Sequence, residues 1–249
     1  MGIGIGPGDP ELITVKAAKA LKTVDVICVP KAHADKPSMA IGMIKHILAE
    51  RERPPEVLEL VFPMIKDELG LKTAWARNAD IIAEKAKNGS IIAFITLGDP
   101  MFYSTFIYLC QSMKEEYPEV KLEIIPGVTS LTACAASSKI PLAEKEEVVA
   151  IIPSAIDSNH IEEIAKYAAT LIFMKGAQRL KGLVPILEKC GFTRNSTVAL
   201  VRRCTMPEEK VIVGKLGDVQ SWDIDEDYFS MAIVKRSELP SNRKHGDVL

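Results

Sequence analysis

Residues 2–17 read G-I-G-I-G-P-G-D-P-E-L-I-T-V-K-A and hold the local signals from which the fold can be predicted. The stretch begins as a short apolar strand and passes into a glycine-rich turn. Asp9 is placed to cap the next helix, and Pro10 suits the first helical position, where its missing N–H is not needed. Apolar residues then recur at helical spacing up to Leu21. The pattern predicts a strand, a tight turn and a helix, the repeating unit of α/β proteins.

The same alternation continues to about residue 126. Short apolar runs of strand length are separated by longer amphipathic segments of helix length. The predicted strands are 2–6, 25–29, 57–61, 91–96 and 121–125, and the predicted helices are 11–22, 38–50, 71–87 and 103–116. This alternation predicts a mainly parallel sheet with right-handed crossovers, and ligands bind such sheets at the carboxyl ends of the strands.

After residue 126 the pattern becomes that of a second α/β unit. The predicted elements are a small-residue helix at 129–138, a polar connector at 153–159, a helix at 178–189 and strands at 148–152, 170–174, 197–201, 209–216 and 229–234. The strands around Val201 and Val211 follow each other without a helix, which predicts an antiparallel pair and a mixed second sheet. We expect an N-terminal domain over 1–126, a C-terminal domain over 127–240 and a flexible polar tail over 241–249.

The composition is that of a globular protein and excludes several classes of function. The chain has 249 residues, 47% of them apolar, and its formal net charge of -2 gives no global attraction to nucleic acid or to an anionic membrane. The longest apolar run, 91–97, is far shorter than the roughly 20 residues that a transmembrane helix needs. The first residues lack the basic region of a secretory leader, so we expect a cytoplasmic location.

The cysteines and histidines predict neither disulfides nor a metal site. The five cysteines form an odd set without a C-x-x-C motif, and most of them lie in apolar surroundings. The four histidines are widely scattered. We therefore expect no structural zinc.

Two Gly-Asp-Pro turns are the first candidates for a ligand site. The turn at 4–11 fails as a dinucleotide fingerprint because Asp9 stands where the third glycine is needed, and no Gly-Lys-Ser/Thr follows to make a Walker motif. The turn at 96–105 repeats the Gly-Asp-Pro sequence at another strand end. If the two turns are neighbours, they form one cleft whose carboxylates favour a neutral or cationic ligand over a phosphate. A capped turn without a ligand is the alternative for each.

Two further motifs follow in order, Pro-Gly-Val-Thr-Ser at 126–130 and Met-Lys-Gly at 174–176. Together the four motifs resemble those of the tetrapyrrole methylase family, over nearly the whole chain from Gly2 to about Arg236. The resemblance implies transfer of methyl groups from S-adenosylmethionine to tetrapyrrole carbons, two α/β domains with the cofactor in a cleft between them, and a homodimer. It also implies that the cofactor contacts Pro7, Leu97, Gly98, Asp99, Phe102, Thr129, Ser130 and Met174.

Within the family, the stretches 60–64 and 96–106 are most similar to the branch that methylates C20 of precorrin-2 or of its cobalt form. A ring bearing many carboxylates needs a local basic lining on a chain of net charge -2. The candidates for that lining are Lys31, Lys36, Lys66, Arg202 and Arg203, with His33 beside the first two. His33 and Tyr103 are the candidates for a base that removes the C20 proton after transfer. A solvated charge or a packed ring is the alternative for each.

The sequence is also compatible with several other functions. The nearest are methylation of another tetrapyrrole carbon, of a modified histidine in a translation factor, or of ribose in ribosomal RNA. The acidic pI of about 6.1 disfavours only the last of these, because an RNA-binding protein needs a basic face. A carrier that binds the nucleotide or the tetrapyrrole without turnover is a rival of another class. A dehydrogenase is disfavoured because the third glycine is missing. The sequence leaves both the cobalt-loaded and the metal-free substrate possible.

Overall fold

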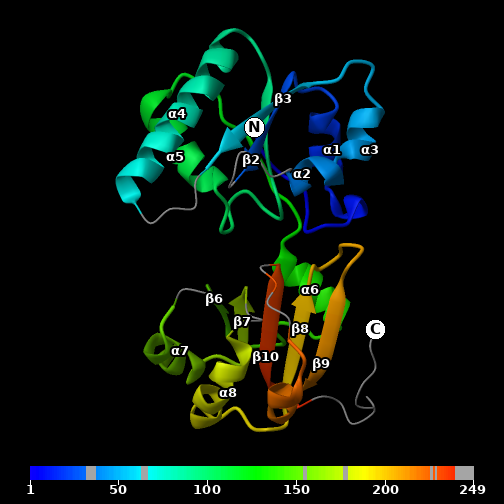
Figure 1. The fold of residues 1–249 in the computed structure, drawn as a ribbon, viewed down its shortest axis with the longest axis vertical. Coiled ribbons are helices and arrows are strands. Elements are labelled where there is room, and N and C mark those ends of the chain that lie inside the picture. The colour runs from blue at the N-terminus through cyan, green and yellow to red at the C-terminus, as the bar shows by residue number, and fades with distance from the viewer. Residues whose placement is uncertain are drawn as a thin grey trace. The chain divides into compact units, whose positions relative to one another are not determined.

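The computed structural model of the chain describes residues 1–31, 38–62, 67–153, 156–175, 179–224, 227 and 229–238. The side chains of residues 68 and 69 are not described. The chain divides into two compact units, Met1–Thr129 and Ser130–Leu249. Each unit has its own five-stranded sheet (Figure 1). The division falls three residues after the boundary expected from the sequence, and the expected tail, 241–249, lies outside the described residues.

Unit 1 contains a parallel sheet, as predicted. Its strands lie in the order β3-β2-β4-β1-β5, and every pairing is parallel. The strands are β1 (Gly2–Gly4), β2 (Val26–Lys31), β3 (Glu56–Val61), β4 (Ile92–Thr96) and β5 (Ile124–Ile125). Gly4 pairs with Thr96, and Ile3 pairs with Ile125. This register brings the carboxyl ends of β4, β1 and β5 side by side, and each of these strands is followed by one of the predicted turns.

Helices cover both faces of the unit 1 sheet. They are η1 (Pro10–Leu12), α1 (Val15–Leu21), α2 (Met39–Met43), α3 (Lys45–Ala49), α4 (Glu68–Lys87) and α5 (Phe106–Glu116). One apolar cluster joins α1, α2 and α3 to alternate strand residues such as Ile27 and Ile95. A second cluster joins α4 and α5 to the intervening residues, such as Cys28 and Phe94. Burial on both faces explains why the central strands read as continuous apolar runs.

The structure divides two of the predicted helices and shortens a third. The helix expected at 11–22 is interrupted because the Thr14 side chain accepts a hydrogen bond from the Ala17 amide, 3.2 Å away, and so starts a new helix. The helix expected at 38–50 breaks at Ile44, where ψ is 3°. α5 begins three residues later than expected, because Tyr103 has a left-handed φ of 48° that a right-handed helix excludes.

Unit 2 contains the predicted mixed sheet. Its strands are β6 (Val149–Ile152), β7 (Thr170–Met174), β8 (Ser196–Arg202), β9 (Lys210–Lys215) and β10 (Ser230–Glu238), in the order β6-β7-β10-β8-β9. β6 and β7 are parallel, whereas β10 is antiparallel to both of its neighbours. β8 and β9 are antiparallel, and Val201 pairs with Val211, the two residues around which that pair was predicted. Figure 1 shows β10 in the middle of this sheet.

The helices of unit 2 are α6 (Ser130–Ser138), α7 (Ser158–Ala165), α8 (Leu180–Lys189) and the 3-10 helix η2 (Leu216–Ser221). α7 and α8 share one apolar cluster with β6, β7, β8 and β10, while α6 packs on β8, β9 and β10. Helix α7 was not predicted from the sequence; it begins inside the predicted connector, where Asp157 caps it by accepting hydrogen bonds from the amides of Asn159 and His160. None of the described helices is long and apolar enough to cross a membrane.

Candidate functional site

The two Gly-Asp-Pro turns of unit 1 are in contact. The amide of Gly98 donates a hydrogen bond to the carbonyl of Gly6 over 2.7 Å, and these glycines form an isolated antiparallel bridge. The third turn joins them through Asp99, whose Oδ2 accepts a hydrogen bond from the Gly127 amide over 2.9 Å. Three segments that are far apart in the sequence therefore form one continuous edge at the carboxyl ends of β1, β4 and β5. We call this group of turns the turn site.

Close backbone packing explains the glycines of the turn site. A Cβ on Gly127 would lie 2.1 Å from the Gly98 carbonyl oxygen and 2.9 Å from the Gly4 Cα. Gly98 also has a φ of +67°, a left-handed value that favours glycine. A side chain at Gly127 would push the turns apart, and a side chain at Gly98 would strain the left-handed backbone, so both positions favour glycine.

The two aspartates of the turns are engaged with backbone amides. Asp9 Oδ1 accepts from the Glu11 amide over 2.8 Å, which makes Asp9 the predicted cap, although the helix it caps is the short η1. Asp99 Oδ1 accepts from the Met101 amide over 2.8 Å while Oδ2 holds Gly127. Asp99 therefore joins two turns. A carboxylate has about four acceptor positions, so these two bonds leave capacity for about two more donors from a ligand.

The segment after Asp99 presents two aromatic rings. Phe102 is half-buried and contacts the Tyr103 ring edge-on, with 4.7 Å between the centroids, and Tyr103 is 56% exposed. Ser104 anchors the segment by accepting from the Phe106 amide and by hydrogen bonding Thr96 over 3.0 Å. The left-handed backbone at Tyr103, a conformation that costs free energy, keeps its phenol outside the core.

The other expected cofactor residues lie at strand ends and turns. Pro7 is buried, and Leu97, Thr129, Ser130 and Met174 are half-buried. Leu97 and Thr129 belong to unit 1, whereas Ser130 starts α6 and Met174 ends β7 in unit 2. Half-buried residues at such positions can offer part of their surface to a ligand while the fold holds the rest.

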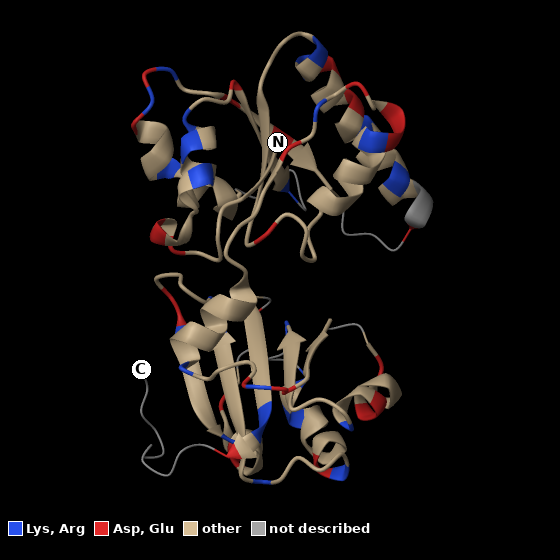
Figure 2. Cartoon of the chain, turned by 180° about the vertical axis from the view of Figure 1, so that it is seen from behind, with Lys and Arg blue, Asp and Glu red and all other residues tan. Residues whose placement is uncertain are grey.

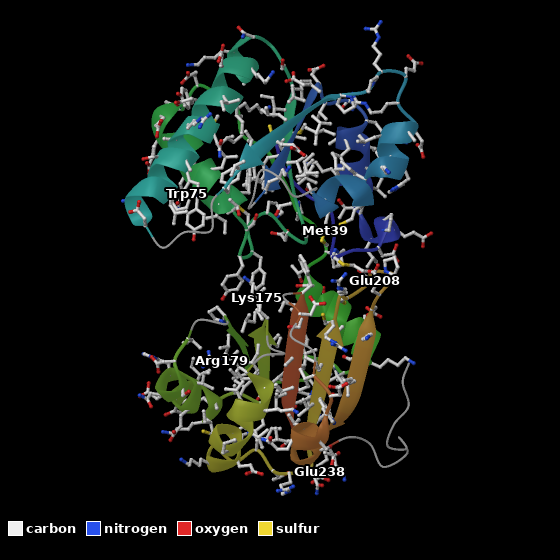
Figure 3. All side chains as sticks on the ribbon, viewed as in Figure 1. Met39, Trp75, Lys175, Arg179, Glu208 and Glu238 are labelled. Atoms are coloured by element: carbon white, nitrogen blue, oxygen red, sulfur yellow. The ribbon has the colours of Figure 1, made fainter. Side chains whose placement is uncertain are left out.

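In unit 2, Met174 shares its sheet edge with the arginines expected to bind substrate. Met231 of β10 pairs with Met174 on one side and with Val201 on the other, which places Arg202 at the same edge. Figure 3 labels Lys175, which follows Met174 there. Arg202 is buried, and Arg203 is exposed with a φ of 48°.

Arg203 is ion-paired inside unit 2. Its Nε lies 2.8 Å from Asp227 Oδ2, and its Nη1 lies 3.9 Å from Glu208 Oε2. The hydrogen bond from the guanidinium lowers the pKa of Asp227 below its ordinary value. Asp227 lies 24 residues from Arg203, and no local sequence signal predicts this pair.

Lys31 also has an ion-pair partner that the sequence did not reveal. It ends β2, is buried, and places its Nζ 2.9 Å from Glu59 Oε2 on the adjacent strand. Figure 2 shows that basic and acidic residues are interleaved on the helices of each unit. The other basic candidates, His33, Lys36 and Lys66, lie outside the described residues.

Two further observations concern metal ligands and cavities in the described part of the chain. Within the described ranges, no cluster of three or more His, Cys, Asp and Glu side chains could hold a metal ion. A cavity of about 850 Å³ lies at the opposite edge of the unit 1 sheet, where it is lined by residues at the strand starts such as Met1 and Ile92. That cavity is separate from the turn site.

Comparisons with known proteins agree with this geometry. A family model described as Tetrapyrrole (Corrin/Porphyrin) Methylases matches residues 1–220. The chain is 38% identical, over 94% of its length and 95% of the relative's, to a probable cobalt-precorrin-2 C(20)-methyltransferase of Methanocaldococcus jannaschii. It is 32% identical, over 84% of each chain, to the cobalt-precorrin-2 C(20)-methyltransferase of Salmonella typhimurium.

The fold is also similar to that of solved structures. One is a uroporphyrin-III C-methyl transferase from Thermus thermophilus complexed with S-adenyl homocysteine. The TM-score is 0.67 at 21% sequence identity, with 94% of this chain and 90% of that chain covered. This likeness supports the two-sheet architecture.

Proposed function

The chain belongs to the tetrapyrrole (corrin/porphyrin) methylase family, and from this premise we propose that it transfers a methyl group from S-adenosylmethionine to C20 of precorrin-2 or cobalt-precorrin-2. This reaction would belong to cobalamin biosynthesis. The observation that carries the proposal is the meeting of three sequence motifs at one sheet edge through Gly6, Gly98, Asp99 and Gly127. Both C20-methylating relatives are matched over more than four fifths of their length.

The turn site fits a cofactor of this kind. Bare backbone at Gly98 lets a ligand approach the main chain closely, and Asp99 has acceptor capacity left for a hydroxyl or amine donor. We propose that Leu97 and Phe102 contact the adenine, and that Pro7, Thr129, Ser130 and Met174 complete the contacts. S-adenosylmethionine, when bound, supplies an electrophilic methyl group on a positively charged sulfur.

Alignment is the main contribution that we assign to the protein. Methyl transfer is an in-line displacement, and holding reacting atoms in line contributes up to about 7 to 11 kcal/mol to catalysis. The three turns hold one another through hydrogen bonds of 2.7 to 2.9 Å, so they are arranged before a ligand binds. Tyr103 is 56% exposed, and we propose it, with His33, as a candidate to accept the C20 proton after transfer.

Substrate carboxylates would be bound by basic residues already held in place. Glu59 holds Lys31, and Asp227 holds Arg203 next to Arg202, so these side chains lose little freedom when a carboxylate arrives. We propose that these three residues, together with Lys36 and Lys66, bind the ring's acidic side chains. A paired guanidinium can bind a carboxylate through two hydrogen bonds.

We also propose that the protein is a cytoplasmic homodimer that acts on a small-molecule substrate, with neither nucleic acid nor membrane as a partner. Methylation of another tetrapyrrole carbon is the second candidate function. The likeness to a uroporphyrin-III C-methyl transferase favours this second candidate, because that enzyme shares the two-sheet architecture and is named for methylating a different tetrapyrrole.

The test is anaerobic incubation of the purified chain with methyl-labelled S-adenosylmethionine and either precorrin-2 or cobalt-precorrin-2. Mass spectrometry and carbon NMR then locate any new methyl group. One methyl at C20 supports the proposal, and the faster of the two substrates identifies the metal state. A methyl group at another carbon would assign the chain to another branch of the family. If the protein fails to bind S-adenosylhomocysteine, the methylase proposal itself is contradicted.

A further inference from the structure

Two buried hydroxyl groups lie at the ends of the loop that carries most of the turn site. Thr96 is the last residue of β4, and Ser104 lies just before α5. The two side chains are 9% and 7% exposed, and their hydroxyl oxygens are 3.0 Å apart. We call Thr96 and Ser104 the hydroxyl pair. The loop that it encloses, 97–103, contains the candidate site residues Leu97, Gly98, Asp99, Phe102 and Tyr103.

The hydrogen bonds around the pair have an arrangement that satisfies both buried hydroxyl protons. Ser104 Oγ accepts from the Phe106 amide over 3.1 Å, so its own proton can be donated to Thr96. The Thr96 hydroxyl then donates to the Leu97 carbonyl, 3.5 Å away. Because a buried hydroxyl without a partner costs free energy, this is the arrangement that we assign.

The two ends of the loop are held in different ways. Near its start, Gly98 and Asp99 form hydrogen bonds with the two neighbouring turns. Near its end, Tyr103 has a left-handed φ of 48°, which costs free energy for a residue with a side chain. Such a conformation persists only where the surrounding structure fixes it. Ser104 follows directly and is held by two hydrogen bonds, so it fixes this end of the loop.

We propose that Ser104 is a positioning residue for methyl transfer and that it acts through its hydrogen bond with Thr96. This bond closes the loop 97–103, in which the rings of Phe102 and Tyr103 meet edge-on with their centroids 4.7 Å apart. Phe102 is one of the residues assigned to the adenine, so displacing this end of the loop weakens cofactor binding. The step rests on the proposed function, because it requires the cofactor to lie against the turn site.

Calorimetric titration with S-adenosylhomocysteine tests the effect on cofactor binding. Thr96→Val removes the hydroxyl and keeps the branched side chain, whereas Ser104→Ala also removes the acceptor of the Phe106 amide. We expect the affinity to fall about three- to tenfold in each variant, which corresponds to the loss of one hydrogen bond. Thr96→Ser keeps the hydroxyl and should bind as tightly as the wild type. Wild-type affinity in both Thr96→Val and Ser104→Ala overturns the proposal.

A double variant tests whether the two residues act together. Two groups that share one hydrogen bond have effects that do not add. The variant that combines Thr96→Val with Ser104→Ala should therefore bind within about a factor of two of Ser104→Ala alone. If the two single losses multiply in the double variant, Ser104 does not act through Thr96 and the proposal is wrong.

Ser196→Ala is the matched control for a general loss of stability. Ser196 is also buried, and its Oγ accepts from the Thr193 amide over 2.9 Å and donates to the Arg236 carbonyl over 3.1 Å. It begins β8 in unit 2, at the opposite end of that strand from Arg202. The variant should lower the urea midpoint, as Ser104→Ala does, and bind S-adenosylhomocysteine like the wild type. An equal loss of affinity in the control overturns the positioning role.

Hydrogen exchange followed by mass spectrometry tests the loop without a cofactor. In the wild type, the amides of Met101 and Phe106 donate to Asp99 and Ser104. In Ser104→Ala we expect exchange over residues 99–106 to become at least about threefold faster, with no change there in Ser196→Ala.

The exchange experiment also separates this inference from the proposed function. Exchange over 99–106 that stays at the wild-type rate in both Thr96→Val and Ser104→Ala contradicts the closing of the loop by the hydroxyl pair. If the wild type does not bind S-adenosylhomocysteine at all, the proposed function is contradicted. The exchange rates then still decide whether the hydroxyl pair holds the loop.

Discussion

The turn site of unit 1 and the central strand of unit 2 are stabilised by different interactions. In unit 1, main-chain groups of Gly98 and Gly127 approach each other so closely that a Cβ would be 2.1 Å from an oxygen. In unit 2, β10 carries two cations into the sheet. Lys235 is 3% exposed and lies 2.8 Å from Glu147, while Arg236 donates to three backbone carbonyls and stacks on Phe192.

This difference determines which requirements of the fold can be recognised in the sequence. Where backbone segments are crowded, only glycine fits, so the close packing of the turns can be recognised from the glycines in their own sequence. A buried cation demands acceptors, and these come from distant positions such as Glu144 and Pro141, more than 90 residues before Lys235. Unit 1 should therefore be sensitive to added atoms, whereas unit 2 should be sensitive to removed ones.

Gly127→Ala should have the largest effect. The new methyl group collides with the Gly98 carbonyl, which is backbone and has no rotamer to change, so the turns must separate. A misplacement near 1 Å at a reacting site costs about 100-fold in rate, and overpacking costs about 1 to 3 kcal/mol of unfolding free energy. Methyl-transfer assays and urea unfolding measure the two effects.

Gly42→Ala is the matched control for that variant. A Cβ at Gly42, inside α2, would meet nothing within 4 Å. It should leave methyl transfer unchanged and stabilise the chain by up to about 1 kcal/mol. Equal behaviour of the two alanine variants would refute the claim that backbone crowding builds the turn site.

Lys235→Ala should be the most damaging single truncation in unit 2. It removes a buried aliphatic stem together with the charge that pairs with Glu147 and Glu144 and the hydrogen bond to the Pro141 carbonyl. We expect a loss of about 2 to 4 kcal/mol in urea unfolding. Lys235→Met keeps the stem and should recover most of that loss. If the methionine variant is as unstable as the alanine variant, the ion pair matters more than the packing.

Thr14→Ala should have a smaller effect confined to unit 1. The Thr14 hydroxyl caps α1 through the Ala17 amide, and loss of such a cap costs about 1 kcal/mol. The chain has two tryptophans, Trp75 in unit 1 and Trp222 in unit 2, so Trp222→Phe leaves a fluorescence probe of unit 1 alone. Thr14→Ala should lower the unfolding midpoint in that background, and Thr14→Ser should restore it.

Acid should weaken the Lys235 pair, with the smallest effect of this series. The hydrogen bond from Lys235 lowers the pKa of Glu147 below its ordinary 4.5. A depressed carboxyl pKa adds stability that is fully present above about pH 4.5 and is lost as the pH falls through the lower folded-state value. The difference in unfolding free energy between wild type and Glu147→Gln should therefore be constant near neutral pH and shrink toward pH 3. A difference that grows on acidification would contradict this assignment.

Most of the architecture could be predicted because it follows from apolar patterning. The parallel sheet of unit 1 and the Val201–Val211 pair were both predicted correctly. The missed helix α7 has its apolar residues, such as Ile161 and Ala165, behind a polar stretch that resembles a connector. The cap signal of Asp157 was present and could have revealed it.

The candidate site could be predicted in part. The sequence showed that the Gly-Asp-Pro turns end strands of one sheet, and the structure places them in contact. The left-handed backbone of Tyr103 and the partners of Lys31 and Arg203 were not predicted. These depend on strand register and on contacts across 24 or more residues, which local patterns do not encode.

The central place of β10 also sets the order in which the two units can assemble during synthesis. Every strand of the unit 1 sheet has left the ribosome once residues near 125 emerge, whereas the unit 2 sheet remains two separate pairs until residues 230–238 arrive. Chains grow at about 5 to 20 residues per second, so unit 1 has several seconds to fold alone. A ribosome stalled before residue 230 would thus display a finished first unit beside a second one with exposed strand edges, which are prone to aggregation.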